Sequence, residues 1–170
     1  ATMQVKLQGR ANTSTLCMNE TNHTTMLKEQ TGQETANGDV LVFPASFGQQ
    51  RLWFLDQLEP GSSAYNITFA VRLTGELNEA ALQSSLNDLV ARHETLRTTF
   101  ATENDEPVQV TAGRSTIKLQ VVSADEANLN HLLVQLSNQG FDLVNGPLLR
   151  VQLIRLSGNT SVLFFNIQKK

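Results

Sequence analysis

The sequence predicts an α/β domain in which helices pack against a mixed β-sheet. Segments that alternate apolar and polar residues, as half-buried strands do, are interleaved with segments whose apolar residues recur every three or four positions, as amphipathic helices do. The last segment, S-V-L-F-F-N-I at 161–167, has the nearly continuous apolar character of a strand buried on both faces. At 170 residues the chain has the length of one ordinary domain.

The first helix is predicted directly after Ser46. Ser46 is followed three residues later by Gln49, which is the pattern of a capping box at a helix N-terminus. Pro60-Gly61 is expected to end the element. Apolar residues recur at helical spacing between these signals, at Leu52, Trp53, Leu55 and Leu58.

A strand and a second helix are predicted next. Residues 67–73 alternate in the manner of a strand with one face inward, and Gly75 closes it. The second helix is expected to begin at Asn78, with Glu79 favourably placed in its first turn, and to end near His93. Its buried stripe is predicted to be Leu82, Leu86, Leu89 and Val90.

Three strands are expected in the middle of the chain. Residues 96–100 and 108–110 read as a pair joined by the turn-forming stretch 103–107. Residues 117–121 alternate as a third strand.

A third helix and two closing strands complete the prediction. Ser123 and Glu126 are expected to form another capping box, and Gly140 is a natural C-terminal stop. Residues 149–153 alternate as a strand, and the apolar segment 161–167 is expected to pair back on it. The helix carries leucines at one face, Leu129, Leu132, Leu133 and Leu136.

The chain is expected to divide into a disordered leader or linker at residues 1–41 and a folded unit at residues 42–170. Every aromatic residue lies at or beyond Phe43, whereas the first forty residues are rich in Thr, Asn, Gln and Gly. Such a segment buries too little apolar surface to offset the entropy of ordering. The alternative is a short helix over residues 24–30.

The composition of the chain also limits which kinds of partner it can bind. A net charge of −3 gives no basic field for nucleic acid, and no stretch approaches the roughly 18 consecutive apolar residues of a membrane span. Cys17 is the single cysteine, so it has no internal disulfide partner, and no secretory leader opens the chain. We therefore expect a cytoplasmic location, with no nucleic acid and no membrane as partners.

A search for independent catalytic patterns gives little. The sequence has no phosphate loop, no metal-spaced pair of Cys or His, and no Gly-x-Ser-x-Gly elbow. His93 lies between Arg92 and Glu94 at a predicted helix end, where a histidine more often satisfies backbone carbonyls than acts as a base. No metal ligand and no directly bound cofactor are predicted.

Two stretches of the sequence indicate a protein family far more specifically than the patterns above. S-F-G-Q-Q-R-L-W-F-L at 46–55 and R-H-E-T-L-R-T-T-F at 92–100 resemble the first two signature motifs of the condensation domains of nonribosomal peptide synthetases. The residues of these two motifs are most similar to those of the subtype that joins two L-configured amino acids. The resemblance runs from about Phe43 to Ile167 and includes two further stretches, L-E-P-G-S-S-A-Y-N-I at 58–67 and F-D-L-V-N-G-P-L-L-R at 141–150.

The resemblance implies a fold and a reaction. Members of the family are built like two chloramphenicol-acetyltransferase lobes side by side, with the active site in a tunnel between them. Carrier proteins dock at the two mouths and present thioesters on phosphopantetheine arms, and the acceptor amine attacks the donor carbonyl to form an amide. The key signature is H-H-x-x-x-D-G, whose second histidine positions or deprotonates the amine, while its aspartate is structural.

In the family this signature follows the apolar strand with which the present sequence closes. Gln168 and Lys169 stand where the two histidines are expected, and Lys170 follows. Glutamine cannot act as a base, and lysine is normally protonated, with a pKa of about 10.4. No catalytic residue is carried over from the family. The matched positions are expected to support the first lobe: Ser46, Gln50, Arg51, Leu52, Trp53, Arg92, His93, Glu94, Arg97 and Phe100.

These observations predict a truncated condensation domain, comprising a leader and most of the N-terminal lobe, without activity of its own. Agreement with the family is lost abruptly at Gln168, which favours a shifted reading frame. Two alternatives are half of a split enzyme, completed by another polypeptide, and a docking module for carrier proteins. A lobe without its C-terminal partner lobe is also expected to self-associate through uncovered apolar surface.

Overall fold

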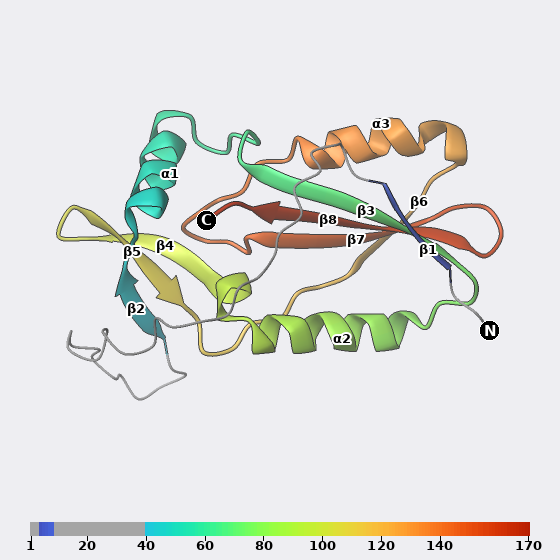
Figure 1. Cartoon of the computed structure of the whole chain (residues 1–170), viewed down its shortest axis with the longest axis horizontal. Helices are drawn as coiled ribbons and strands as arrows, with labels where there is room; N and C mark the ends of the chain where they lie inside the picture. The colour runs from blue at the N-terminus through green and yellow to red at the C-terminus, as the bar shows by residue number, and fades with distance from the viewer. Residues whose placement is uncertain (1–3, 9–39) are drawn as a thin grey trace, which may run out of the picture.

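A computed structural model of the chain describes residues 4–8 and 40–170, with side chains for residues 40–170. Its strands form two sheets, one of five strands and one of three (Figure 1). The order in the larger sheet is β1 (Gln4–Gln8), β3 (Asn66–Thr74), β8 (Thr160–Gln168), β7 (Leu149–Arg155) and β6 (Gln120–Ser123). The order in the smaller sheet is β2 (Leu41–Pro44), β5 (Glu106–Thr111) and β4 (Thr98–Glu103).

The five-stranded sheet is mixed, as predicted. β6 and β7 are parallel, and every other neighbouring pair is antiparallel. β8 lies in the centre, between β3 and β7, with Leu153 of β7 opposite Leu163 of β8. The prediction that the last apolar segment pairs back on the strand before it is confirmed.

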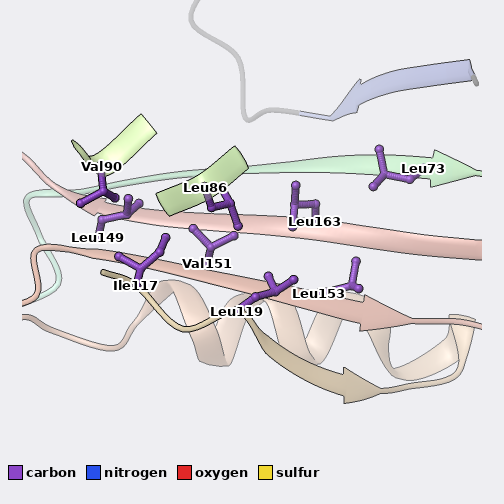
Figure 2. Packing of buried hydrophobic residues seen from close by; sticks show 9 residues of the cluster. All are labelled: Leu73, Leu86, Val90, Ile117, Leu119, Leu149, Val151, Leu153 and Leu163. Carbon is purple, nitrogen blue, oxygen red and sulfur yellow. The ribbon is translucent and has the colours of Figure 1, made fainter. Parts of the chain in front are cut away.

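Two helices cover opposite faces of this sheet. Leu153 and Ile154 are adjacent on β7 and therefore point to opposite faces, and both are fully buried. Leu153 belongs to the cluster that contains Leu86 and Val90 of α2 (Glu79–Arg92), and Figure 2 labels the buried residues of this cluster. Ile154 belongs to the cluster that contains α3 (Glu126–Ser137). The larger sheet is thus the middle layer of a three-layer α/β core.

The smaller sheet is antiparallel and lies beside α1 (Phe47–Leu58) at one end of the molecule (Figure 1). β4 and β5 form a hairpin whose two loop residues, Asn104 and Asp105, have φ of 50° and 64°. Two successive residues with positive φ are typical of the tight turn that matches the twist of a hairpin. The turn predicted between the two strands is confirmed.

The strand predicted over 96–100 begins later than expected. Residues Glu94–Arg97 form a 3-10 helix, η1, and β4 begins only at Thr98. The amide of Leu96 donates to the carbonyl of His93 at 2.9 Å, which closes a short helical turn. The apolar character of Leu96 suits either structure, so alternation alone could not place the boundary.

The strand predicted over 117–121 is also displaced, because β6 begins at Gln120. Side chains of α2 take the backbone groups that a strand partner would use. Gln83 donates to the carbonyl of Ile117 and accepts from the amide of Leu119, both at 2.8 Å, and Asn87 accepts from the amide of Ile117 at 3.1 Å.

The ends of α3 correct two further expectations. The N-cap is Asp125, whose carboxylate accepts from the amide of Asn128 at 2.8 Å, and not Ser123, which ends β6. The helix ends at Ser137, before Gly140. Gly140 instead allows a close approach, because a Cβ there would lie 1.7 Å from the carbonyl oxygen of Gly61.

The segment expected to be a disordered leader contains one described element, the strand β1. Its five residues pair with β3 in register from Gln4 with Thr74 to Gln8 with Ala70. Sequence reasoning missed this strand, although V-K-L at its centre alternates as a strand does. The alternative helix over 24–30 lies outside the described residues.

Candidate functional site

The stretch at 46–55 forms the start and centre of α1, and hydrogen bonds fix its beginning. Ser46 is the N-cap, and the predicted capping box with Gln49 is present in both directions. Gln49 also donates to the side chain of Gln109 on β5 at 2.9 Å. Gln50 donates to the carbonyl of Ala45 at 3.1 Å. These polar residues therefore anchor α1 to the smaller sheet.

The two signature stretches meet through an aromatic contact. Trp53 of α1 and Phe100 of β4 have ring centroids 6.2 Å apart with planes tilted by 38°. Phe100 is buried, whereas Trp53 is half-buried at the edge of the same cluster. That cluster consists of Ala45, Phe100, Phe141, Leu143 and Leu148. It joins α1, β4 and the 141–148 loop into a second, smaller core.

The remaining residues of α1 are less covered than predicted. No residue of α1 is buried; Leu52 is half-buried, Arg51 is exposed, and Leu58 retains 67% of its surface. The apolar stripe expected to face the core is therefore only partly covered, since Leu52, Trp53 and Leu55 are half-buried and Leu58 is exposed. The rest of α1 contributes surface.

The stretch at 92–100 begins at the end of α2. His93 is the C-cap of that helix, and its amide donates to the carbonyl of Leu89 at 3.0 Å. Arg92, His93 and Glu94 all have exposed side chains. His93 therefore has a backbone role at the junction between α2 and η1, and its imidazole faces solvent.

Arg97 differs, because only 10% of its side chain is exposed. Its guanidinium donates to the carbonyl of Ala112 and pairs with Glu94 at 3.3 Å. The Nε atom is buried and has no hydrogen-bond partner among the residues that the structure describes. A buried guanidinium N–H without an acceptor is costly, so this atom marks a place where an acceptor is needed.

The end of β8 lies against the same stretch. The side chain of Gln168 is buried, and the backbone amide of Gln168 donates to the carbonyl of Leu148 at 3.0 Å. The amide of Lys169 donates to the carbonyl of Tyr65 at 3.0 Å. The ammonium of Lys170 donates to the carbonyls of Thr95 and Thr98. Burial lowers the pKa of Lys170 to about 8. Lys170 thus joins the end of β8 to η1 and the start of β4, and we refer to residues 168–170 together with η1 as the candidate site.

This site offers hydrogen-bond donors and one cation of lowered pKa. Gln168 supplies an amide that cannot take up a proton, and the ammonium of Lys170 is engaged by backbone carbonyls. Within residues 4–8 and 40–170, no three His, Cys, Asp or Glu side chains come together as a group that could hold a metal ion. No helix in that part of the chain is long and apolar enough to cross a bilayer.

The fold and the motif contacts agree with known proteins. The family model described as "Condensation domain" matches residues 41–167, which is well over half of the chain. The chain belongs to the condensation domain family. The match begins at the first residue of β2 and ends one residue before Gln168.

Curated relatives with similar condensation-domain sequence are large synthetases. A linear gramicidin synthase of Brevibacillus parabrevis is 50% identical over 131 residues, which cover 73% of this chain and 2% of that protein. Chondramide synthase cmdD of Chondromyces crocatus is 42% identical over 129 residues, covering 72% of this chain and 3% of that protein. The chain therefore spans only a few per cent of the length of these relatives.

Solved condensation-domain structures share the fold. The X-domain from teicoplanin biosynthesis superposes with a TM-score of 0.67 at 33% identity, covering 74% of this chain and 27% of that one. The starter condensation domain of rhizomide synthetase RzmA gives a TM-score of 0.65 at 21% identity, covering 75% and 32%. The predicted chloramphenicol-acetyltransferase-like lobe is confirmed, and it accounts for about a third of such a domain or less.

Sequence reasoning missed a polar cluster that fixes β8 within this condensation-domain lobe. Asn166 of β8 donates to the carbonyls of Leu136 and Gln139 at 3.0 and 3.4 Å. Asn66 of β3 and Arg150 of β7 also donate to the carbonyl of Gln139, at 2.9 and 3.3 Å. One signal was visible, because Asn166 is the single polar residue between Val162 and Ile167. A polar residue inside a buried strand needs partners.

Proposed function

We propose that this chain supplies the N-terminal lobe for amide formation between carrier-protein-bound aminoacyl or peptidyl thioesters, and that these 170 residues have no such activity alone. The observation that carries the proposal is the end of β8. There, Gln168, whose side chain is buried, and Lys169, whose side chain is exposed, stand where the resemblance to the family places its two histidines. A glutamine side chain has no basic atom, and a lysine is ordinarily protonated near neutral pH, so these residue types are poor general bases.

The lobe's contribution is positional. β8 leads to the position where the family carries its histidine signature. It is held by β3 and β7 on either side and by its own Asn166, which donates to the carbonyl of Leu136 near the end of α3. Arg97 adds a buried Nε that lacks an acceptor among the described residues. A carboxylate supplied by a complementary segment, such as the aspartate of the family signature, has the chemistry to satisfy it.

The tethered substrates are proposed to reach the site from carrier proteins, each on a phosphopantetheine arm. Condensation domains act with carrier proteins within synthetases, and the subtype implied by the motif wording joins two L-configured residues. The arm is the partner's group, so this lobe requires no cofactor of its own. Because both reactants arrive on tethers, their orientation supplies much of the rate acceleration.

A chimera tests the proposal. Residues 1–167 are fused to the histidine signature and second lobe of the matching condensation domain from linear gramicidin synthase, and amide formation is measured by mass spectrometry with two loaded carrier proteins. We expect product from the chimera and none from the 170-residue chain. Product from the 170-residue chain alone, or a folded chimera that forms none, would contradict the proposal.

The split-enzyme alternative is separated by mixing. The 170-residue chain is combined with a separately produced second lobe that carries the histidine signature. Amide formation only in the mixture would support a split enzyme. If the chimera is active and the mixture is inactive, the N-terminal lobe works only when it is covalently joined to the second lobe. The matched control is a mixture with a second lobe in which the histidines of the signature are replaced by glutamine.

A further inference from the structure

The ε-amine of Lys170 is a nucleophilic group to which the proposed function gives no role. Its nitrogen lies at the junction between η1 and β4, where the carbonyls of Thr95 and Thr98 each accept one of its N–H donors. Lys170 is half-buried, whereas its neighbour Lys169 is exposed. Within residues 4–8 and 40–170, no carboxylate forms an ion pair with Lys170. The amine is therefore fixed in place by neutral groups.

The carbonyls that hold this amine belong to a backbone segment that is itself fixed. Thr98 is buried, and its hydroxyl donates to the carbonyl of Glu94 at 2.7 Å. The same hydroxyl is hydrogen-bonded to the hydroxyl of Thr111 on β5 at 2.9 Å. Thr98 also begins β4, which pairs with β5 along its whole length. The position of the Lys170 amine is therefore set by the fold and not by a mobile loop.

This geometry determines which proton the ammonium of Lys170 can release. An ammonium group has three N–H donors, and two of them face the carbonyls of Thr95 and Thr98. Loss of the third proton leaves the nitrogen lone pair directed away from both carbonyls. Burial makes this loss easier, because it lowers the pKa of Lys170 to about 8.

We propose that Lys170 is an acyl acceptor, whose ε-amine takes the acyl group from a thioester that reaches the candidate site. The proposal rests on the proposed function in one respect, namely that carrier-bound thioesters are brought to the end of β8. It adds an activity of this chain alone, in which a resident amine takes the place of the amine of a second carrier-bound substrate.

The chemical step needs no reactant other than the thioester. Water takes up the proton that the ammonium of Lys170 releases. The nitrogen then attacks the thioester carbonyl carbon, a C–N bond forms as the C–S bond breaks, and the departing sulfur takes a second proton from the nitrogen. The products are an amide on Lys170, a free thiol and one solvated proton.

Mass spectrometry with a small thioester tests the proposal. The folded 170-residue chain is incubated at about pH 8 with S-acetyl-N-acetylcysteamine, whose thioester resembles the end of a phosphopantetheine arm. Chymotrypsin cuts after Phe165 and releases residues 166–170, and fragmentation of this peptide assigns the acetyl group to Lys169 or to Lys170. We expect Lys170 to be acetylated about tenfold or more faster than Lys169.

The expected rate ratio follows from the amount of free amine. With a pKa of about 8, about half of the Lys170 side chains carry a free amine at pH 8. A lysine of ordinary pKa, about 10.4, has less than about 1% of its amine free at that pH. Part of this advantage is lost because, as with thiols, nucleophilicity falls as the pKa falls.

Two variants and an unfolded sample serve as controls. Lys170→Met should remove the fast acetylation, whereas Lys169→Met, the matched variant at the exposed neighbour, should retain it. In concentrated urea, the rate at Lys170 should fall to that at Lys169, because the contacts with Thr95 and Thr98 are lost. Circular dichroism verifies that each variant is folded in the absence of urea.

Equal rates at Lys169 and Lys170 in the folded chain would overturn the proposal, as would a rate at Lys170 that urea does not reduce or an absence of acetylation at both residues. The test uses no carrier protein and no second lobe, and the chimera that tests the proposed function ends its own part of the chain at residue 167. The two proposals can therefore fail separately. Fast acetylation of Lys170 beside an inactive chimera would retain the acceptor lysine and reject the proposed function.

Discussion

The larger sheet and the end of the molecule that holds α1 differ in how completely they cover their own apolar residues. In the larger sheet, Leu153 and Ile154 have no exposed surface, since α2 and α3 cover the two faces. Figure 2 shows Leu153 within the cluster on the α2 side. At the other end, α1 has no buried residue and β2 is exposed along its whole length. The first region buries the apolar residues at its centre, although Ile67 and Phe69 of β3 stay partly exposed, whereas the second region leaves most of its apolar residues exposed.

The two regions are joined by a small number of close contacts. The 141–148 loop contributes Phe141 and Leu143 to the smaller core, and the carbonyl of Leu143 accepts from the amide of Phe100 at 2.8 Å. Gly140 lies directly against Gly61. Substitutions in the core, at the junction and on α1 should therefore have effects of decreasing size.

The largest effect is expected in the core of the larger sheet. Leu153→Ala removes a fully buried side chain and leaves a cavity, so the free energy of unfolding should fall by about 2–5 kcal/mol. Urea unfolding followed by circular dichroism measures the loss. Val134→Ala on exposed α3 is the control, with an expected change within about 0.5 kcal/mol. A loss below about 1 kcal/mol at Leu153 would show that the core repacks freely.

The junction should be the next most sensitive place. Gly140→Ala would put a Cβ 1.7 Å from the carbonyl oxygen of Gly61, so one of the two backbone segments must move. Overpacking of this kind costs about 1–3 kcal/mol. Gly48→Ala is the matched control, since a Cβ at Gly48 meets nothing within 4 Å and alanine favours the helix. Equal effects of the two alanines would contradict the close approach.

The sequence predicted the core well because periodicity reports burial directly. The alternation of β7 and the apolar run of β8 placed both strands, and the capping box at Ser46 placed the start of α1. It failed where side chains from distant segments decide the backbone. Gln83 and Asn87 of α2 keep residues 117–119 out of a strand. No local pattern around Ile117 carries that information.

The candidate site was predicted in part, for a similar reason. The residues of the two signature motifs identified the stretches that contain Trp53, Arg97 and Phe100. The distance between the motifs along the sequence could not show that the two stretches meet in space. The contact between Lys170 and the carbonyls of Thr95 and Thr98 joins residues more than seventy positions apart. Buried hydrogen bonds between distant residues are set by the tertiary fold, so they appear only once the strands are in register.

A smaller change in the free energy of unfolding is expected from the titration of a residue at the end of β8. Burial lowers the pKa of Lys170 to about 8 in the folded chain, whereas an unfolded lysine has a pKa of about 10.4. Between these values the unfolded chain binds more protons, so the free energy of unfolding should rise with pH and the penalty present at neutral pH should disappear. We expect a gain of about 1 kcal/mol between pH 7 and 10, after allowing for solvent screening.

The measurement compares variants across pH. Urea unfolding is followed at pH 7, 8, 9 and 10 for the natural chain, Lys170→Met and Lys169→Met. The rise should be absent from Lys170→Met and present in Lys169→Met, whose side chain is exposed in the folded chain. A rise retained in Lys170→Met would assign the titration to another group.

The smallest effect is expected on the outer face of α1. Phe47→Ala removes a side chain that is 91% exposed, so at low micromolar concentration the free energy of unfolding should change by no more than about 0.5 kcal/mol. Trp53→Ala on the same helix removes the contact with Phe100 and should cost about 2 kcal/mol or more. Urea unfolding of both variants decides whether α1 has one covered face or two. Comparable losses at Phe47 and Trp53 would mean that the outer face of α1 is already covered within a single chain, and the contrast between a covered core and an uncovered helix face would fail.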